Sequence, residues 1–294
     1  MKESIGFVGV GLMGHGMAKN IVESGYPLTV IAHTNRAPVE DLLARGASEA
    51  TTLEELASNS SIIHICAPGS PEVEKIVSSL MTSMKPGSVI VDCSTSDPNS
   101  TISLGQRLGS AGLHIADAPL GGTPVQAESG ELSTMVGADD EVFARIKPVI
   151  GAWAQTIVHI GAIGAGHKMK LLNNFLSLGY AALYSEALAL SEKVGISSAQ
   201  FDSVIRGSRM DCGFYQTFMD CVVGGNREAH KFTLKNGLKD LMYLEAMADN
   251  ATLANPIGNA VKNSFAQAIS AGHNGPQDYV PHLAEHVKKL NGLS

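Results

Sequence analysis

The sequence predicts an α/β protein, in which a doubly wound, mostly parallel sheet is followed by an all-α domain. Two observations support this prediction. Short apolar runs rich in β-branched residues alternate with helical stretches up to about residue 160. Beyond that point the strand pattern fades, and one long apolar helical stretch begins at residue 166. We therefore expect two domains, residues 1–162 and residues 163–294.

The predicted strands are short apolar runs that end at glycine, proline or polar residues. They cover residues 5–10, 28–31, 62–66, 88–92, 113–116 and 157–160. Helical spacing of apolar residues fills the intervals at residues 13–24, 37–45, 72–84 and 100–110. Buried strands that alternate with helices indicate parallel β-α-β units with right-handed crossovers.

The second half is predicted to be built around one long helix, residues 166–194. Its apolar residues cover more than one face, so we expect other helices to pack on several sides of it. Further helices follow at residues 198–207, 234–249, 255–271 and 278–290. In the last of them His282 and His286 lie one helical turn apart, but no carboxylate or cysteine joins them. We expect both histidines to be solvated, and we predict no metal site.

Composition excludes several classes of function. The 21 basic and 28 acidic residues give a net charge of −7, which argues against binding to nucleic acid or to anionic lipid. No stretch approaches the ~20 apolar residues of a membrane span, and residues 5–10 are too short for the core of a signal peptide. The four cysteines show no CxxC or zinc-binding spacing. These features predict a cytoplasmic protein with reduced thiols.

A glycine-rich loop, GVGLMG, closes the first predicted strand and opens the first predicted helix. Gly9 permits a tight turn, Gly11 lets the backbone approach a pyrophosphate, and Gly14 allows the helix to pack closely on the strand. The helix N-terminus offers N–H groups to phosphate oxygens, with Leu12 and Met13 in the same loop. This context predicts a Rossmann-type domain that binds a nicotinamide dinucleotide. The alternative is a glycine turn with a packing role alone.

The choice between NAD and NADP depends on the end of the second strand. An acidic residue there would bind the ribose hydroxyls of NAD, but the sequence continues as HTNR. Thr34, Asn35 and Arg36 could instead hold the 2′-phosphate of NADP, Arg36 through a charge-assisted hydrogen bond. A solvated arginine after a strand is equally common. The sequence thus favours NADP over NAD slightly.

Four motifs, in this order, indicate a resemblance to a known family. They are GFVGVGLMG at residues 6–14, DAPLGGT at residues 117–123, GAGHKMKLLNN at residues 164–174 and KDL at residues 239–241. Together they resemble the β-hydroxyacid dehydrogenases, a family that includes 3-hydroxyisobutyrate dehydrogenases, tartronate semialdehyde reductases and glyoxylate/succinic semialdehyde reductases. The resemblance covers nearly the whole chain. It implies an NAD(P)-dependent enzyme that interconverts a small β-hydroxyacid and its semialdehyde by hydride transfer.

In this resemblance the general acid/base is the lysine of GxGxxxKxxNN, which falls on Lys170. Lys170 and Asn174 are four residues apart, so both project from one face of the long helix. An ammonium group there can protonate the alkoxide that forms when hydride reaches an aldehyde carbon, and the Asn174 amide can hold the substrate oxygen. The alternative for Lys170 is a solvated helix lysine.

The resemblance also implies a substrate carboxylate site in residues 117–123. The family's loop reads DAPVSGG, and this sequence has Gly121 at the serine position, followed by Gly122 and Thr123. Main-chain N–H groups of a glycine-rich loop can still bind an anion, and the Thr123 hydroxyl can compensate for the serine. The layout is also similar to the sulfolactaldehyde reductase branch, which carries an arginine where this chain has Gly122. That difference weakens the prediction of a sulfonate substrate.

Three further residues correspond to cofactor-binding positions of the family. Thr95 matches a residue that hydrogen-bonds near the nicotinamide ribose, and Pro68 matches the loop that lines the cofactor cleft. Lys239 matches a lysine that reaches the cofactor from the helical domain. Each has a plainer interpretation: a turn residue at a strand end, a loop breaker, and a surface salt bridge with Asp240.

Two other functions stay open beside the dehydrogenase. An imine reductase would share the fold, but those enzymes commonly place an aspartate or tyrosine where this chain has Lys170. A non-catalytic cofactor-binding module would keep the fold as well, but such relatives have lost the lysine. Because the long helix is apolar on several sides, we also expect it to bury a subunit interface, in a homodimer or a homotetramer.

Overall fold

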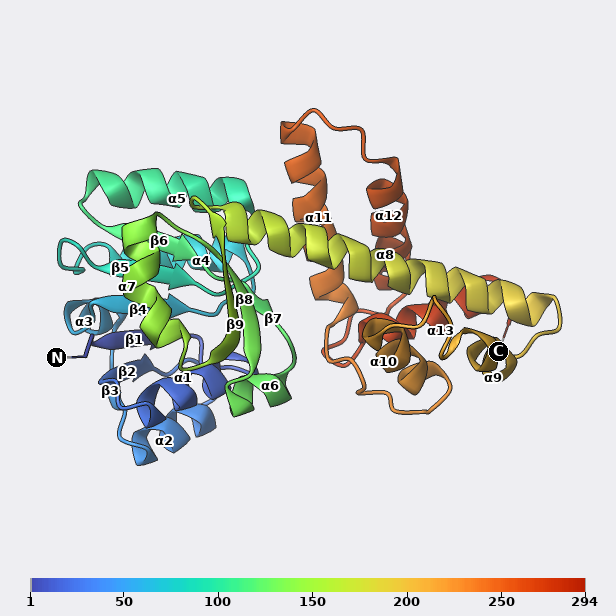
Figure 1. Ribbon diagram of the computed structural model, residues 1–294, viewed down its shortest axis with the longest axis horizontal. Helices are drawn as coiled ribbons and strands as arrows, with labels where there is room; N and C mark the ends of the chain where they lie inside the picture. Colours follow the sequence, from blue (N-terminus) through green and yellow to red (C-terminus); the bar gives the residue numbers. More distant parts are fainter. Residues whose placement is uncertain (1, 294) are drawn as a thin grey trace. The chain divides into compact units, whose positions relative to one another are not determined.

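The computed structural model describes residues 2–293, and the chain divides into two compact units, Met1–Lys170 and Leu171–Ser294. Helix α8 (Ala165–Lys193) begins in the first unit and continues into the second (Figure 1). The predicted order, a mostly parallel sheet with helices followed by an all-α region, is confirmed. Within residues 2–293 no helix is both long and apolar enough to cross a membrane.

One sheet forms the framework of the first unit, in the order β3-β2-β1-β4-β5-β6-β8-β7, with β9 paired to β8. Neighbours from β3 to β6 are parallel, whereas β8 is antiparallel to β6 and β7 and parallel to β9. The strand order reverses between β1 and β4, which is where sheets of this kind bind ligands. The strands are β1 (Ile5–Val8), β2 (Leu28–Ile31), β3 (Ser48–Ala50), β4 (Ile62–Ile65), β5 (Val89–Asp92), β6 (His114–Asp117), β7 (Leu120–Gly121), β8 (Leu132–Gly137) and β9 (Ala154–Gly161).

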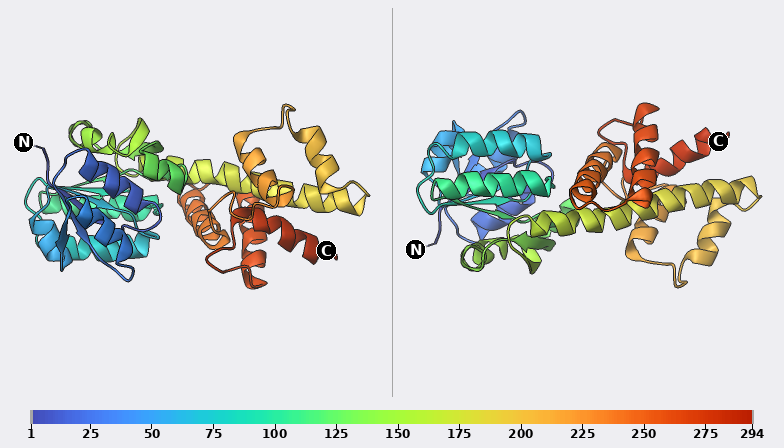
Figure 2. Two further views of the ribbon diagram at one scale, coloured as in Figure 1. Left: turned by 90° about the horizontal axis from the view of Figure 1, so that it is seen from below. Right: turned by 90° about the horizontal axis from the view of Figure 1, so that it is seen from above.

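Helices cover both faces of this sheet, as the two views in Figure 2 show. Successive strand side chains point to opposite faces, so Phe7 enters one core and Val8 enters the other. The core around Phe7 is covered by α1 (Gly14–Glu23), α2 (Ala37–Ala44), α6 (Pro124–Ser129) and α7 (Asp140–Ile150). The core around Val8 is covered by α3 (Leu53–Ser58), α4 (Ser70–Leu80) and α5 (Pro98–Ser110).

The second unit is built from helices that share one apolar core with α8. This core includes Leu178 of α8 together with Phe218 and Phe265, which are almost fully buried. The remaining elements are α9 (Ser198–Ile205), α10 (Gly213–Val222), α11 (Leu234–Asn250), α12 (Pro256–Ser270), the 3-10 turn η1 (Val280–His282) and α13 (Leu283–Leu290).

One apolar stripe of α8 is left uncovered by the rest of residues 2–293. Leu172, Leu176, Leu183 and Leu190 expose 46%, 57%, 64% and 65% of their surface. Their spacing of four and seven residues places them on one side of the helix. Within the described residues, the helices of this chain pack on the core face of α8, and its other apolar residues form this exposed stripe. The expectation that helices pack on several sides of α8 is thus met on the core face alone.

The two histidines of the last predicted helix are buried, contrary to expectation. His282 exposes 2% of its surface and His286 7%, because His282 lies in the buried turn η1 and His286 lies on the buried face of α13. Burial lowers the pKa of His282, so its ring is neutral at pH 7. Nδ1 accepts a hydrogen bond from the Tyr279 N–H, and Nε2 lies 3.2 Å from the Arg227 carbonyl oxygen. His282 therefore has a structural role.

Candidate active site

The glycine loop connects β1 to α1 beside the point where the strand order reverses. Gly9 has a φ of +95°, and a Cβ atom there would lie 2.1 Å from the Cys66 carbonyl oxygen after β4. A Cβ at Gly14 would lie 2.1 Å from the Gly9 carbonyl oxygen, so the helix start packs directly on the strand end. At Gly11, by contrast, a Cβ would meet no described residue within 4 Å, and Leu12 exposes 65% of its surface. The backbone at Gly11 faces open space, which fits a pyrophosphate.

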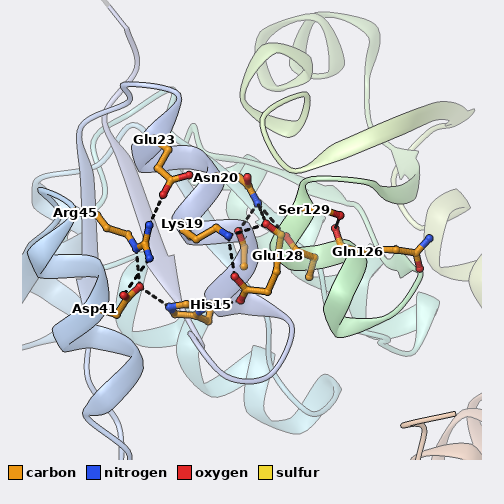
Figure 3. A network of polar contacts seen from close by, with 11 residues as sticks. His15, Lys19, Asn20, Glu23, Asp41, Arg45, Gln126, Glu128 and Ser129 are labelled. Atoms are coloured by element: carbon orange, nitrogen blue, oxygen red, sulfur yellow. Dashed lines mark hydrogen bonds and ion pairs between the residues drawn. The ribbon is translucent and has the colours of Figure 1, made fainter. Parts of the chain in front are cut away.

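Helix α1 is held by a polar network that also contacts α2 and α6 (Figure 3). His15, in its first turn, places Nδ1 2.8 Å from a Glu128 oxygen and Nε2 2.9 Å from an Asp41 oxygen. Both nitrogens donate when the ring is protonated. Hydrogen bonds from Arg45 and then from His15 lower the pKa of Asp41 to about 2. Among the described residues, the N-cap Met13 makes no side-chain cap, which suits a helix start that receives a phosphate.

The residues after β2 contact one another and β3. The Thr34 hydroxyl lies 3.0 Å from His33 Nδ1, and Asn35 Oδ1 accepts a hydrogen bond of 3.2 Å from the main chain at the start of α2. Arg36 donates two hydrogen bonds of 3.0 Å to the Glu49 carboxylate on β3. The acid that is missing from the end of β2 is therefore present nearby, on the neighbouring strand.

The loops after β4 and β5, which carry Pro68 and Thr95, are tied together. The Ser94 hydroxyl accepts a hydrogen bond of 2.9 Å from the N–H of the residue before Pro68. The buried Asp92 carboxylate accepts hydrogen bonds from the Ser94 N–H at 2.9 Å and from the Ser96 hydroxyl at 2.8 Å, on either side of Thr95. Thr95 is therefore held in a well-supported loop at the carboxyl end of β5.

The start of α8 is fixed by Asp117, the last residue of β6. Its fully buried carboxylate accepts hydrogen bonds of 2.6 Å from the Gly164 N–H and 2.7 Å from the His167 N–H. A Cβ at Gly166 would lie 2.3 Å from the Met135 carbonyl oxygen, so only glycine allows so close an approach. Burial raises the pKa of Asp117, while the neighbouring His167 and the two N–H groups oppose that effect.

His167 joins the same helix start to the loop after β5. Its fully buried ring places Nδ1 2.8 Å from Thr101 Oγ1 and Nε2 3.0 Å from the Ser94 carbonyl oxygen. The Asp92 and Asp117 carboxylates lie 3.8 Å and 3.9 Å from the ring nitrogens. We call Asp92, Thr101, Asp117 and His167 the buried node. It links the ends of β5 and β6 to α5 and to α8.

The node anchors the start of α8, the helix that carries Lys170. Lys170 follows His167 by three residues, which is about 4.5 Å of helical rise, and its side chain is half-buried. The carboxyl ends of the parallel strands β1, β2, β4, β5 and β6 meet at one edge of the sheet. The first unit therefore brings Lys170, Thr95 and the glycine loop to the same edge.

In the predicted acid loop, neighbouring side chains explain both glycines. A Cβ at Gly121 would lie 2.5 Å from Ser133 Oγ, so a hydroxyl from β8 occupies the space beside this glycine. Gly122 has a φ of +126°, and a Cβ there would lie 2.9 Å from Gln126 Oε1. The Thr123 hydroxyl accepts a hydrogen bond from the Gln126 N–H, and the Thr123 N–H donates to Gln126 Oε1. Thr123 therefore caps α6, and the Ser133 hydroxyl donates a hydrogen bond of 3.2 Å to the Gly121 carbonyl oxygen, which holds the loop against β8.

In the second unit, Asp240 holds two of the predicted site residues. Asn174 Nδ2 donates a hydrogen bond of 2.7 Å to one carboxylate oxygen, and Lys239 Nζ lies 3.1 Å from the other. Asp240 and Asn174 expose only 2% and 5% of their surface. The salt bridge between Lys239 and Asp240, which was the alternative interpretation of Lys239, is present, but it is partly buried and Asp240 is shared with Asn174, so it is not a plain surface pair.

Both halves of the chain match family models. Residues 4–161 match the model described as the NAD binding domain of 6-phosphogluconate dehydrogenase. Residues 164–283 match the model described as NAD-binding of NADP-dependent 3-hydroxyisobutyrate dehydrogenase. The 2-(hydroxymethyl)glutarate dehydrogenase of Eubacterium barkeri is 35% identical over 205 residues, which cover 68% of this chain and 67% of that protein. The chain belongs to the β-hydroxyacid dehydrogenase family.

A further relative agrees with this assignment, and a solved structure shares the fold. The NAD-dependent L-serine dehydrogenase of Pseudomonas aeruginosa is 32% identical over 280 residues, which cover 92% of this chain and 94% of that protein. The structure of 3-hydroxyisobutyrate dehydrogenase from Mycobacterium tuberculosis, solved with L-serine, superposes with a TM-score of 0.87 at 24% identity, covering 98% of this chain and 100% of that one. This likeness shows the shared fold. The predicted class, an NAD(P)-dependent dehydrogenase, is supported by the relatives.

Several residues that contact the predicted site received no site role from the sequence, although Asp117, His167 and Asp240 lie within the quoted motifs. They act on the predicted residues rather than replacing them, since each contacts a loop or helix that carries one. One available signal was that Asp92 and Asp117 are acidic residues at the ends of buried strands, where a carboxylate needs partners. The residues are Glu49, Asp92, Asp117, Ser133, His167 and Asp240.

Proposed function

We propose that this protein interconverts a small β-hydroxyacid and its semialdehyde with NAD or NADP, and that Lys170 is the general acid/base. One observation carries the proposal: the glycine loop, the Thr95 loop and the anchored start of α8 share one edge of the sheet. When bound, the cofactor supplies hydride to the aldehyde carbon or accepts it from the alcohol carbon. The balanced reduction consumes one aldehyde, one NAD(P)H and one proton.

The proton is the part of this reaction that the protein supplies. Lys170 donates it to the substrate oxygen as that oxygen becomes an alkoxide, and in the oxidative direction neutral Lys170 accepts it from the alcohol. Asn174 lies four residues further along the same helix face. Because its Nδ2 carries two hydrogens and gives one to Asp240, the second can bind the substrate oxygen.

The acid group of the substrate is assigned to the loop of Gly121, Gly122 and Thr123. Since the Thr123 hydroxyl caps α6 and the Ser133 hydroxyl donates to the Gly121 carbonyl oxygen, we propose that main-chain N–H groups of the loop bind the carboxylate. The substrates in the relatives' names, 2-(hydroxymethyl)glutarate and L-serine, share a hydroxymethyl group next to a carboxylate-bearing carbon. We propose the same substrate class for this chain.

The substrate is best identified by a parallel screen. Succinic, tartronic and methylmalonic semialdehydes, glyoxylate and sulfolactaldehyde would each be reduced with NADH and with NADPH, and L-serine would be oxidised with both oxidised cofactors. A cyclic imine should be included, because its reduction without turnover of any aldehyde would favour an imine reductase. Turnover of one semialdehyde above all others would support the proposal.

The role of Lys170 has a direct test. Lys170→Ala should lower kcat by about 10²- to 10⁴-fold, the usual contribution of a general acid/base, while cofactor binding is retained. Lys193→Ala, at the exposed far end of the same helix, is the matched control and should keep full activity. Undiminished turnover by Lys170→Ala would refute the role of Lys170.

We further propose that residues 1–162 bind the cofactor and that residues 163–294 complete the substrate site and form the subunit interface. The exposed stripe of Leu172, Leu176, Leu183 and Leu190 supports a homodimer or homotetramer, since such a stripe on a helix is usually buried by a partner. Sedimentation equilibrium at micromolar concentration tests this. A species of only 30.7 kDa would refute it, and Leu183→Glu should shift the protein towards that mass.

A further inference from the structure

The end of β2 carries an ion pair that no motif indicates. Arg36 Nη1 and Nη2 donate hydrogen bonds of 3.0 Å each to the two carboxylate oxygens of Glu49. Glu49 lies on β3, which pairs in parallel with β2 and so brings this carboxylate beside the β2–α2 loop. On α2, Glu40 Oε1 lies 3.7 Å from Arg36 Nε. This is one contact, and it is longer than either hydrogen bond to Glu49.

The geometry of this pair decides what Arg36 can do. A guanidinium binds a carboxylate and a phosphate through the same planar pair of N–H groups. While Glu49 occupies that pair, a 2′-phosphate must displace it or accept a poorer contact. Glu49 also repels a phosphate dianion directly, since both are negatively charged. Both effects act against a cofactor that carries a 2′-phosphate, and neither acts against one that carries a free ribose hydroxyl.

We propose that Glu49 is a specificity-determining residue that withholds Arg36 from the 2′-phosphate of NADP and thereby shifts selectivity towards NAD. This inference rests on the proposed nicotinamide cofactor. It reverses the slight preference for NADP that the HTNR sequence suggested, because the arginine on which that preference depended has a partner of its own.

The surroundings of the pair agree with this role. Arg36 and Glu49 expose 53% and 27% of their side chains, so a ligand at the sheet edge can reach them. The hydrogen bonds from Arg36 lower the pKa of Glu49, which is therefore ionised at neutral pH. Asn35 and Thr34 already contact the main chain of α2 and His33, so Arg36 is the cation of this loop that a 2′-phosphate would need.

The test uses two nucleotides that differ only by the 2′-phosphate, and it requires no turnover. Adenosine 2′,5′-bisphosphate and 5′-AMP would be titrated into the full-length protein by calorimetry. Glu49→Gln should raise the affinity for the bisphosphate relative to 5′-AMP by about tenfold, as Arg36 is released and one repulsive charge is removed. With NADPH and NADH as cofactors, the ratio of kcat/KM should shift in the same direction.

Glu40→Gln is the matched control, because it removes the same charge from the same neighbourhood but leaves the paired hydrogen bonds intact. It should change the ratio by less than about twofold. In an Arg36→Ala background, Glu49→Gln should lose most of its effect, since Glu49 acts largely through Arg36.

Three results would overturn the inference. They are a ratio unchanged in Glu49→Gln, an equal shift in Glu40→Gln, and an undiminished shift in the Arg36→Ala background. Failure of the wild-type protein to bind either nucleotide is a different result, because it would reject the proposed cofactor and the inference with it. Binding of both nucleotides with an unchanged ratio would reject the inference alone.

Discussion

Two groups of charged side chains at the same edge of the sheet differ in their exposure to solvent. At the end of β2, Arg36 and Glu49 form a pair that is largely open to solvent. At the ends of β5 and β6, the carboxylates of Asp92 and Asp117 are buried around His167. An exposed ion pair contributes little to stability, whereas a buried carboxylate depends on every partner it has. The Arg36–Glu49 pair can therefore change without loss of the fold, which suits the proposed selectivity determinant. The buried carboxylates cannot, which suits the support of Lys170, the proposed general acid/base.

The largest effect is expected in the buried node. Asp117→Asn replaces one acceptor oxygen with an NH₂ group, which leaves one of two buried main-chain N–H groups without its partner. We expect the free energy of unfolding to fall by about 3 kcal/mol in urea denaturation at pH 7. Asp140→Asn is the control, because the Asp140 side chain is 99% exposed, and it should change stability by less than about 0.5 kcal/mol. Equal losses in both variants would show that burial does not distinguish this carboxylate.

A milder change in the same node tests its link to catalysis. Thr101→Val removes the hydroxyl that lies 2.8 Å from His167 Nδ1, which should cost about 1–2 kcal/mol of stability. Because His167 fixes the helix start that carries Lys170, kcat should also fall by about fivefold, with the KM for the cofactor nearly unchanged.

The control for this variant is Thr217→Val. Both threonine hydroxyls donate to the main-chain oxygen four residues earlier, at 3.2 Å for Thr101 and 2.9 Å for Thr217, but only Thr101 also reaches His167. The control should lose neither stability beyond the helical hydrogen bond nor kcat. If kcat fell equally in both variants, or in neither, the node would be a packing feature without influence on Lys170.

How much of the fold could be predicted depends on whether a strand is specified by its own sequence or only by the strand beside it. The strands that end at the site were found, because each is a continuous apolar run buried on both faces. β3 was missed, since Ser48–Ala50 is three residues long and carries two polar side chains, and only pairing with β2 makes it a strand. β8 alternates buried and half-buried residues over Leu132–Val136, but the buried set includes Thr134 and the half-buried set includes Met135, so the sequence itself shows no clear period of two.

The same reasoning applies to the site. The glycine loop and Lys170 were predicted because their spacing is local. The Thr123 cap was available too, since TPVQ has the pattern of a capping box. The hydrogen bond from Gly164 to Asp117 joins residues 47 positions apart, and that from Arg36 to Glu49 joins residues 13 positions apart. Contacts of this kind depend on which strands become neighbours, and periodicity does not supply that information.

The network around His15 is intermediate in its expected contribution to stability, between the buried node and the exposed Arg36–Glu49 pair. Hydrogen bonds, first from Arg45 and then from His15, lower the pKa of Asp41 to about 2 from 3.8. A carboxyl group with a lowered pKa in the folded state stabilises the fold above its unfolded pKa, and this contribution disappears as the pH falls towards 2. Asp41 is 40% exposed, so the effect is reduced by solvent. Asp41→Asn should lower the melting temperature by about 2 °C at pH 7 and by clearly less at pH 3.

A difference in melting temperature that stayed constant between pH 7 and pH 3 would show that Asp41 acts through packing instead. Glu40→Gln, on the same helix α2, removes a charge without entering the His15 network, and it should show no comparable dependence on pH. The expected contribution of Asp41 to stability is therefore smaller than that of the buried node and larger than that of the exposed Arg36–Glu49 pair.

The smallest effect on stability is expected at the exposed pair. Glu49→Gln should change the melting temperature by less than about 1 °C at pH 7, because a solvent-exposed ion pair on the edge strand β3 adds little to the fold. The same variant is expected to change the relative affinity for nucleotides with and without a 2′-phosphate. A loss of stability as large as that of Asp41→Asn would make Glu49 a structural anchor and would remove the contrast with the buried node. Unchanged stability with altered selectivity would mean that the carboxylate acts on the ligand and not on the fold.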